Sequence, residues 1–221
     1  MPIISLSNPK GGSGKTTLST QLARAYHERG AKVLLVDSDP QGSAADWHAS
    51  REDNPIPFLT YGRPENMKAL PNVAAPYDYV FIDGAAKLEG MIAAALKVSD
   101  AVLIPVQPSP YDIWAASDLV DLIRARQEVT EGKLVAAFVI SRAIKRTLLS
   151  KEVMTALADY GLPVFAAGTI QRQVYPRTAS EGLTVFDDGA ADAIAEIKAI
   201  AAELDTLLAG RRDHGAQRQT A

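Results

Sequence analysis

The chain of 221 residues contains no cysteine. Disulfide bonds, zinc sites with thiolate ligands and iron–sulfur clusters held by cysteine are therefore excluded, while a reducing compartment is permitted but not required. Long apolar runs are also missing, since no segment reaches the roughly 20 residues that span a bilayer as a helix. The glycine-rich stretch after the first apolar run begins too early for a cleavable signal peptide. We therefore expect a cytoplasmic protein that does not bind to a membrane.

An excess of positive charge is lacking too, because the net charge is −3, which by itself argues against a nucleic-acid binder. The segment 142–177, however, carries six basic and two acidic residues, so its net charge is +4 and that of the remainder is −7. Such asymmetry is typical of a face that binds a polyanion, although an ordinary scatter of solvated charges would look the same. With 47% hydrophobic and 22% charged residues, the composition suits one globular domain with a substantial core.

The most informative segment is Asn8–Thr17, which reads N-P-K-G-G-S-G-K-T-T. Its glycines let the backbone curl tightly and direct N–H groups at phosphate oxygens. Lys15 is placed to neutralise the β- and γ-phosphates, and Thr16 to bind Mg²⁺ through its hydroxyl. Pro9 stands where the common phosphate-binding pattern has its first glycine, and Lys10 adds a second lysine that is not needed to hold a nucleotide within one chain. The expected nucleotide-binding residues here are Lys10, Gly11, Gly12, Ser13, Gly14, Lys15, Thr16 and Thr17.

Near-continuous apolar runs alternate with helical patterns along the chain. Strands are expected at 3–7, 33–36, 79–82, 101–104, 134–140 and 164–167, and helices at 17–29, 88–98, 111–126, 148–160 and 190–208. This βαβα alternation predicts an α/β fold of three layers, with a mostly parallel central sheet flanked by helices. Residues 50–76 are expected to add one short strand and one short helix. One nucleotide-binding domain should span residues 1–209, followed by a polar, disordered tail at 210–221 that has no large apolar side chain.

Two carboxylate motifs follow expected strands, at the edge where ligands bind in parallel sheets. In the first, D-S-D-P-Q, we expect Asp39 to align a water for attack on the γ-phosphate and Asp37 to support the Mg²⁺ shell. Without the upstream loop, a strand-end turn or helix cap would be the better interpretation. In the second, F-I-D-G-A-A, Asp83 should reach the Mg²⁺ through water.

With K-G-G-S-G-K-T-T, D-S-D-P-Q and F-I-D-G-A-A in this order, the chain resembles the ParA/MinD family of deviant Walker ATPases. Two further segments, Val106–Ala116 and Ile170–Tyr175, resemble the short ParA subgroup typified by ParF. Many relatives carry Asn-Arg after the sixth strand, with Asn at the adenine, whereas this chain has Ser141 and Arg142 as the corresponding nucleotide-binding pair.

The resemblance implies that ATP and Mg²⁺ bind, that two subunits sandwich two nucleotides, and that Lys10 reaches the phosphates of the other subunit. Lys10, Lys15 and Asp39 would then be the catalytic residues. The homodimer would bind DNA without sequence preference and associate with the nucleoid. A partner protein would stimulate the weak ATPase, and repeated cycles would segregate a plasmid, a chromosome region or another cargo.

Candidates for the DNA-binding face come from the basic segment, with the tail arginines Arg211 and Arg212 as alternatives. A simple solvated surface would account for each of them equally well. The candidates are Arg142, Lys145, Arg146, Lys151 and Arg177.

Four other functions are alternatives to a partition ATPase. A membrane-cycling regulator of the MinD type needs a basic amphipathic C-terminal helix, whereas the last helical pattern here is acidic. A nitrogenase-type iron–sulfur reductase is removed by the lack of cysteine. A ligase similar to dethiobiotin synthetase would use ATP to activate a small acid, with Lys10 at the substrate. An ATP-gated DNA-binding scaffold with negligible hydrolysis remains a non-enzymatic alternative.

Overall fold

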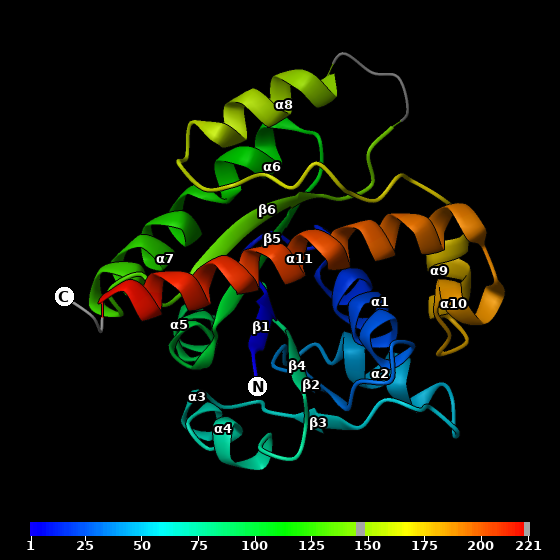
Figure 1. The fold of residues 1–221 in the computed structure, drawn as a ribbon. Coiled ribbons are helices and arrows are strands. Elements are labelled where there is room, and N and C mark those ends of the chain that lie inside the picture. Colours follow the sequence, from blue (N-terminus) through cyan, green and yellow to red (C-terminus); the bar gives the residue numbers. More distant parts are fainter. Residues whose placement is uncertain (145–148, 219–221) are drawn as a thin grey trace.

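A computed structural model describes residues 1–144 and 149–218 of the chain. Within these residues, six parallel strands form one sheet in the order β3-β2-β4-β1-β5-β6 (Figure 1). The strands are β1 (Ile3–Leu6), β2 (Val33–Asp37), β3 (Phe58–Thr60), β4 (Tyr79–Asp83), β5 (Ala101–Val106) and β6 (Val135–Ile140). The predicted α/β architecture with a parallel central sheet is confirmed.

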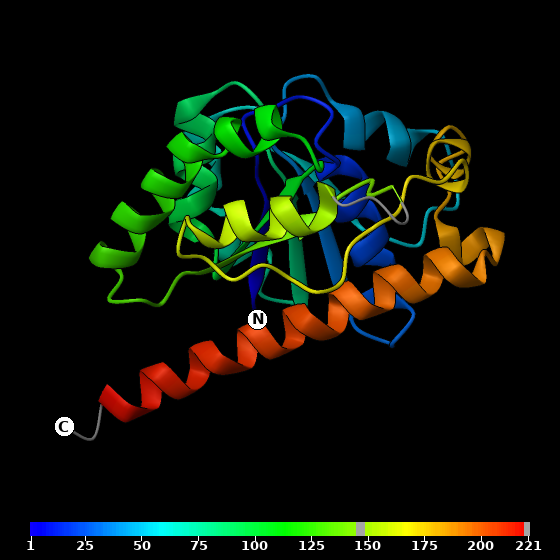
Figure 2. The ribbon, with the colours of Figure 1, turned by 90° about the horizontal axis from the view of Figure 1, so that it is seen from above.

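Helices cover both faces of the sheet. One face packs against α1 (Lys15–His27) and α11 (Ala191–Arg218), and α11 crosses the front of the sheet in Figure 1 and lies along one side of the molecule in Figure 2. The opposite face packs against helices that include α5 (Glu89–Val98) and α7 (Ser117–Val129). The other helices are α2 (Ser43–Ala49), α3 (Pro64–Met67), α4 (Leu70–Val73), α6 (Pro110–Ala115), α8 (Leu149–Ala158), α9 (Val174–Ala179) and α10 (Val185–Asp188).

Burial on both faces explains why the strands read as continuous apolar runs. In β4, Phe81 packs toward α1, whereas Val80 and Ile82 pack toward α5 on the other side. Every residue of β2 is buried, including Asp37 at its end. Because side chains alternate between two covered faces, polar residues are excluded until the strand reaches the carboxyl edge.

The parallel register brings the predicted motifs to one edge of the sheet. Leu6, just before the phosphate-binding loop, pairs with Asp83, and Asp37 pairs with Asp83 on the other side of β4. The strand order therefore places β1, β4 and β2 side by side with their carboxyl ends level.

Two elements differ from the sequence prediction. The strand expected at 164–167 is reduced to an isolated bridge between Phe138 and Val164, because the amides of Ala166 and Ala167 donate to the Glu203 carboxylate of α11 at 2.9 and 2.6 Å. The single helix expected at 111–126 is two helices, α6 and α7, which meet at the buried Ala116.

The C-terminal segment also differs, since α11 continues to Arg218 rather than becoming irregular at Gly210. Arg211 ties this extension to the body, because its side chain donates to the Lys133 carbonyl at 2.5 Å and pairs with Asp100 at 2.5 Å. Among the helices that the structure describes, none combines the length and apolar character needed to cross a bilayer.

Candidate functional site

The phosphate-binding loop between β1 and α1 depends on two glycines with left-handed backbone. Gly12 has φ +76° and Gly14 has φ +104°. A Cβ atom at Gly14 would lie 2.4 Å from the Ser141 hydroxyl, so a larger residue would be both strained and crowded. The Asn8 side chain ties the loop to β5 by donating to the Pro105 carbonyl at 2.7 Å and accepting from the Lys10 amide at 2.8 Å. The Asn8 side chain thereby fixes the start of the loop against β5.

Lys15 begins α1 and points back into the loop. Its ammonium donates to the Lys10 carbonyl at 3.2 Å, and the residue is 7% exposed. Burial lowers the pKa of Lys15, although the nearby carboxylates of Asp83 and Asp39 favour its charged form. A buried cation at the start of a helix is suited to binding a phosphate group.

Thr16 and Asp83 meet at the end of β4. The Thr16 hydroxyl donates to Asp83 Oδ2 at 2.7 Å, and the carboxyl is almost fully buried. Asp83 Oδ1 is buried without a hydrogen-bond partner in the described part of the chain. No group of three or more His, Cys, Asp or Glu side chains forms a metal site within the described residues. Since Mg²⁺ in nucleotide sites takes one or two protein oxygens together with phosphates and waters, this hydroxyl–carboxylate pair fits it.

Burial raises the pKa of Asp83 to about 7, from 3.8 in an exposed chain. Between pH 3.8 and about 7, Asp83 is protonated in the folded protein but ionised in the unfolded chain. The free energy of unfolding of the nucleotide-free protein should therefore fall as pH rises through this range and level off above about 7. We expect Asp83→Asn to remove this part of the pH dependence. Thermal unfolding between about pH 5 and 8 measures it as the difference between wild type and variant. Parallel curves for the two proteins would show that Asp83 titrates normally.

Asp37 orders the loop that carries Asp39. Its two oxygens accept backbone hydrogen bonds from Asp39 and Ala45, each at 2.9 Å. Burial raises the pKa of Asp37, while these hydrogen bonds counteract that rise. The carboxylate therefore fastens the end of β2 to the first turn of α2.

Asp39 lies at the opening of a cavity on the carboxyl edge of the sheet. Its oxygens accept from the amides of Gln41 at 3.0 Å and Ala86 at 3.3 Å. This contact joins the loop after β2 to the loop after β4. The cavity is lined by the phosphate-binding loop, Asp39, residues 86–88 and Arg142. Lys15, Thr16 and Asp39 thus line one cavity.

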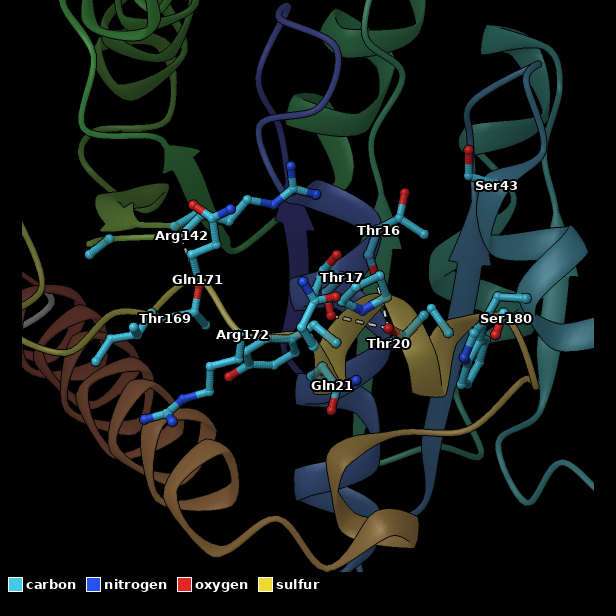
Figure 3. Close-up of a pocket in the computed structure, with 18 of the residues that line it drawn as sticks. Thr16, Thr17, Thr20, Gln21, Ser43, Arg142, Thr169, Gln171, Arg172 and Ser180 are labelled. Atoms are coloured by element: carbon cyan, nitrogen blue, oxygen red, sulfur yellow. Dashed lines mark hydrogen bonds between the residues drawn. The ribbon is translucent and has the colours of Figure 1, made fainter. Parts of the chain in front are cut away.

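A second cavity adjoins the first beyond Thr16 and Thr17 (Figure 3). Arg142 lines both cavities, and in Figure 3 its side chain extends toward the start of α1. It adopts φ +57°, and its amide donates to the Thr169 hydroxyl at 3.0 Å. Ser141 is buried against Gly14 at the inner wall.

The sequence does not indicate several of the residues that line the second cavity, including Gln21, Thr169 and Gln171. From the sequence, the polar stretch at 170–175 shows only a family resemblance and no contact with the site. Glu196 fastens this stretch to α11, because its carboxylate accepts from the Ile170 amide at 3.2 Å and from the Tyr175 hydroxyl at 2.9 Å.

Lys10 has an unexpected neighbour. Its ammonium forms an ion pair with Asp112 of α6 in the same chain. Asp112 had no predicted role, and only its place two residues after Ser-Pro at a strand end could have suggested one.

The DNA-binding candidates are not brought together in the described residues. Arg142 lies at the cavities, whereas Arg177 lies on α9 and pairs with Asp188 at 2.7 Å. Lys145 and Arg146 fall outside the described residues, as does the side chain of Lys151.

Comparison with known proteins places this geometry among nucleotide-binding domains. Residues 4–185 match the CobQ/CobB/MinD/ParA nucleotide binding domain. The chain is similar to "Maintenance of carboxysome distribution protein A" of Halothiobacillus neapolitanus, with 34% identity over 85% of this chain and 88% of the relative.

Two solved structures share the fold. Apo McdA from Cyanothece superposes with a TM-score of 0.76 at 16% identity, covering 92% of this chain and 99% of that one. The septum site-determining protein MinD of Pyrococcus horikoshii, complexed with Mg-ADP, gives 0.74 at 18% identity over 95% and 98%. At these identities the likeness shows the fold alone.

Proposed function

This chain belongs to the CobQ/CobB/MinD/ParA nucleotide-binding family, and we propose that it is a ParA-type positioning ATPase that dimerises on ATP and distributes a cargo over DNA. The observation that carries this proposal is the placement of Lys15, Thr16 and Asp39 around one cavity at the carboxyl edge of the sheet. The relative named for carboxysome distribution favours a protein compartment over a plasmid as the cargo.

ATP would lie with its phosphates on the loop amides and Lys15, because both supply positive potential and Lys15 is buried. The Mg²⁺ ion would neutralise charge on the β- and γ-phosphates when bound. Thr16 and Asp83 would hold it through the hydroxyl and the carboxyl oxygen that lacks a partner among the described residues. A share of Asp37 in the magnesium shell stays a prediction, because both of its oxygens already accept backbone hydrogen bonds.

Asp39 would accept a hydrogen bond from the attacking water and direct it at the γ-phosphate. Its position supports this role, since it is partly exposed at the cavity and held by two backbone amides rather than by a cation. The Ala86 amide, three residues after Asp83, donates to Asp39, so a shift of Asp39 on hydrolysis would be passed to the loop after β4.

Lys10 would act on the nucleotide of the second subunit, where its charge would stabilise the transition state. It lies on the outer side of the loop, with its side chain 36% exposed, whereas Lys15 already fills the inner position. Binding of the γ-phosphate and dimerisation would thereby depend on each other.

DNA binding would follow dimerisation, because two copies of one basic patch bind a polyanion far more tightly than one. Arg142 remains the best described candidate, since the charge of Arg177 is offset by Asp188. Lys145, Arg146 and Lys151 remain predictions.

Co-sedimentation with DNA in the presence of ATP, ADP or no nucleotide tests the proposed function. We expect retention with ATP only, falling steeply as salt rises. Reversing Lys145 and Arg146 to Glu should reduce retention, whereas Arg177→Glu should change it much less because Arg177 is already paired. Equal retention in all three nucleotide states would contradict an ATP-controlled DNA cycle.

Lys10→Ala is expected to keep ATP binding and lose the ATP-dependent dimer, because Lys15 and the loop amides remain in place. Sedimentation with a non-hydrolysable ATP analogue measures the dimer, and nucleotide titration measures binding. The exposed Lys68→Ala serves as a matched control for the loss of one positive charge. Dimers of normal strength in Lys10→Ala would remove Lys10 from the interface.

A further inference from the structure

The ion pair between Lys10 and Asp112 conflicts with a lysine that acts on another subunit. Lys10 belongs to the phosphate-binding loop, and Asp112 belongs to α6, which follows β5. The Asp112 side chain is only 3% exposed, against 36% for Lys10, so the carboxylate is fixed and the lysine reaches in to it. In this arrangement the ammonium is occupied within its own chain.

We propose that this ion pair is an autoinhibitory contact, in which Asp112 holds Lys10 back on its own subunit until a second ATP-loaded copy competes for it. The proposal rests on the proposed function, because it assumes that Lys10 acts across a dimer. The phosphates of the second copy carry more negative charge than one carboxylate, so they can displace Asp112 once ATP is present. Without ATP no such competitor exists, and the chain stays single.

Release of Lys10 has a consequence for Asp112 itself. Asp112 Oδ1 already lacks a hydrogen-bond partner among the described residues, and Oδ2 is the atom that contacts Lys10. Removing Lys10 would leave the carboxylate buried without a counter-charge, which is unfavourable. A short helix can relieve this by moving the carboxylate toward water, and α6 has six residues and is joined to α7 at Ala116.

Movement of α6 would be visible at the protein surface. Tyr111 and Trp114 lie on the same helix as Asp112, are 72% and 64% exposed, and contact each other with ring centroids 5.5 Å apart. They are therefore placed to report whether Asp112 is paired.

The first test compares Asp112→Asn with Asp118→Asn, an exposed acid at the start of α7 that removes the same charge. Two ion pairs open for each dimer formed, so a hold of about threefold per subunit becomes about tenfold in the dimerisation constant. We expect Asp112→Asn to dimerise at about tenfold lower protein concentration with a non-hydrolysable ATP analogue. Asp118→Asn should match wild type.

The possible results separate this inference from the proposed function. If wild type dimerises and Lys10→Ala does not, but Asp112→Asn shows no gain over Asp118→Asn, the hold is refuted and the sandwich dimer stands. If wild type stays a single chain with ATP, both fail.

A second measurement does not depend on dimers or on the stability of one variant. The protein has two tryptophans, Trp47 and Trp114, so 5-fluorotryptophan labelling gives two ¹⁹F resonances that Trp114→Phe assigns. We expect the Trp114 resonance of nucleotide-free Lys10→Ala to move toward its position in the ATP-bound wild type. In nucleotide-free protein, the effects of Lys10→Ala and Asp112→Asn on thermal unfolding should also be less than additive. An unmoved resonance together with additive effects would show that the pair does not form in solution.

Discussion

Lys15→Ala is expected to abolish ATP binding. Lys15 is the buried cation of the phosphate-binding loop, and no other described lysine shares its position at the start of α1. Loss of a buried charged partner costs about 2–5 kcal/mol, which corresponds to roughly 30- to 5,000-fold in affinity. Isothermal titration with ATP and Mg²⁺ measures the change directly.

The control for this variant is Lys68→Ala, which removes an exposed lysine from another part of the chain and should leave the affinity unchanged. Circular dichroism should show that Lys15→Ala remains folded, because the lysine makes its hydrogen bond to the loop rather than to the core. Retained ATP affinity in a folded Lys15→Ala protein would contradict the assignment of the phosphate-binding loop.

Asp39→Ala is expected to separate ATP binding from hydrolysis. The variant loses the carboxylate that would align the attacking water, and such groups typically contribute about 10²- to 10⁴-fold in rate. Binding should persist, because the described contacts of Asp39 are to the amides of Gln41 and Ala86 and not to the phosphate-binding loop. The rate of phosphate release should therefore fall by this factor, while the ATP-bound dimer accumulates on DNA.

Single-turnover phosphate release and DNA co-sedimentation measure the two halves of this prediction. Asp118→Ala, an exposed acid on α7, is the charge-matched control. If Asp39→Ala hydrolyses ATP normally, another group positions the water. If hydrolysis stops but the protein leaves DNA at the wild-type rate, hydrolysis does not drive the cycle. That result would favour the ATP-gated DNA-binding scaffold.

The sequence predicted the sheet well because its strands carry their own signal. Strands buried on both faces cannot tolerate polar residues, so β2 and β4 read as apolar runs that stop at Asp37 and Asp83. The expected strand at 164–167 failed because its apolar character was real while its backbone donors are taken by Glu203. Hydropathy predicts that a segment is buried, but it does not predict which acceptor its backbone amides donate to.

The candidate site also has one part that the sequence indicates and one part that depends on tertiary contacts. The loop, Thr16 and Asp83 could be predicted, because glycine spacing and a strand-end carboxylate lie within short segments. The role of Asp37 in the magnesium shell stays a prediction, and the structure adds that its oxygens accept from the amides of Asp39 and Ala45. The spacing alone could not distinguish these two uses of a carboxylate.

The sequence by itself determined that this chain binds nucleotide phosphates on a parallel α/β sheet, because the residues responsible are close neighbours whose local geometry is enough. Only the tertiary structure decided what Lys10 contacts. Its partner Asp112 lies 102 positions away and becomes a neighbour because β5 is placed beside β1 in the sheet. Strand order is set by packing over the whole domain, so a contact across two strands leaves no mark in either segment alone.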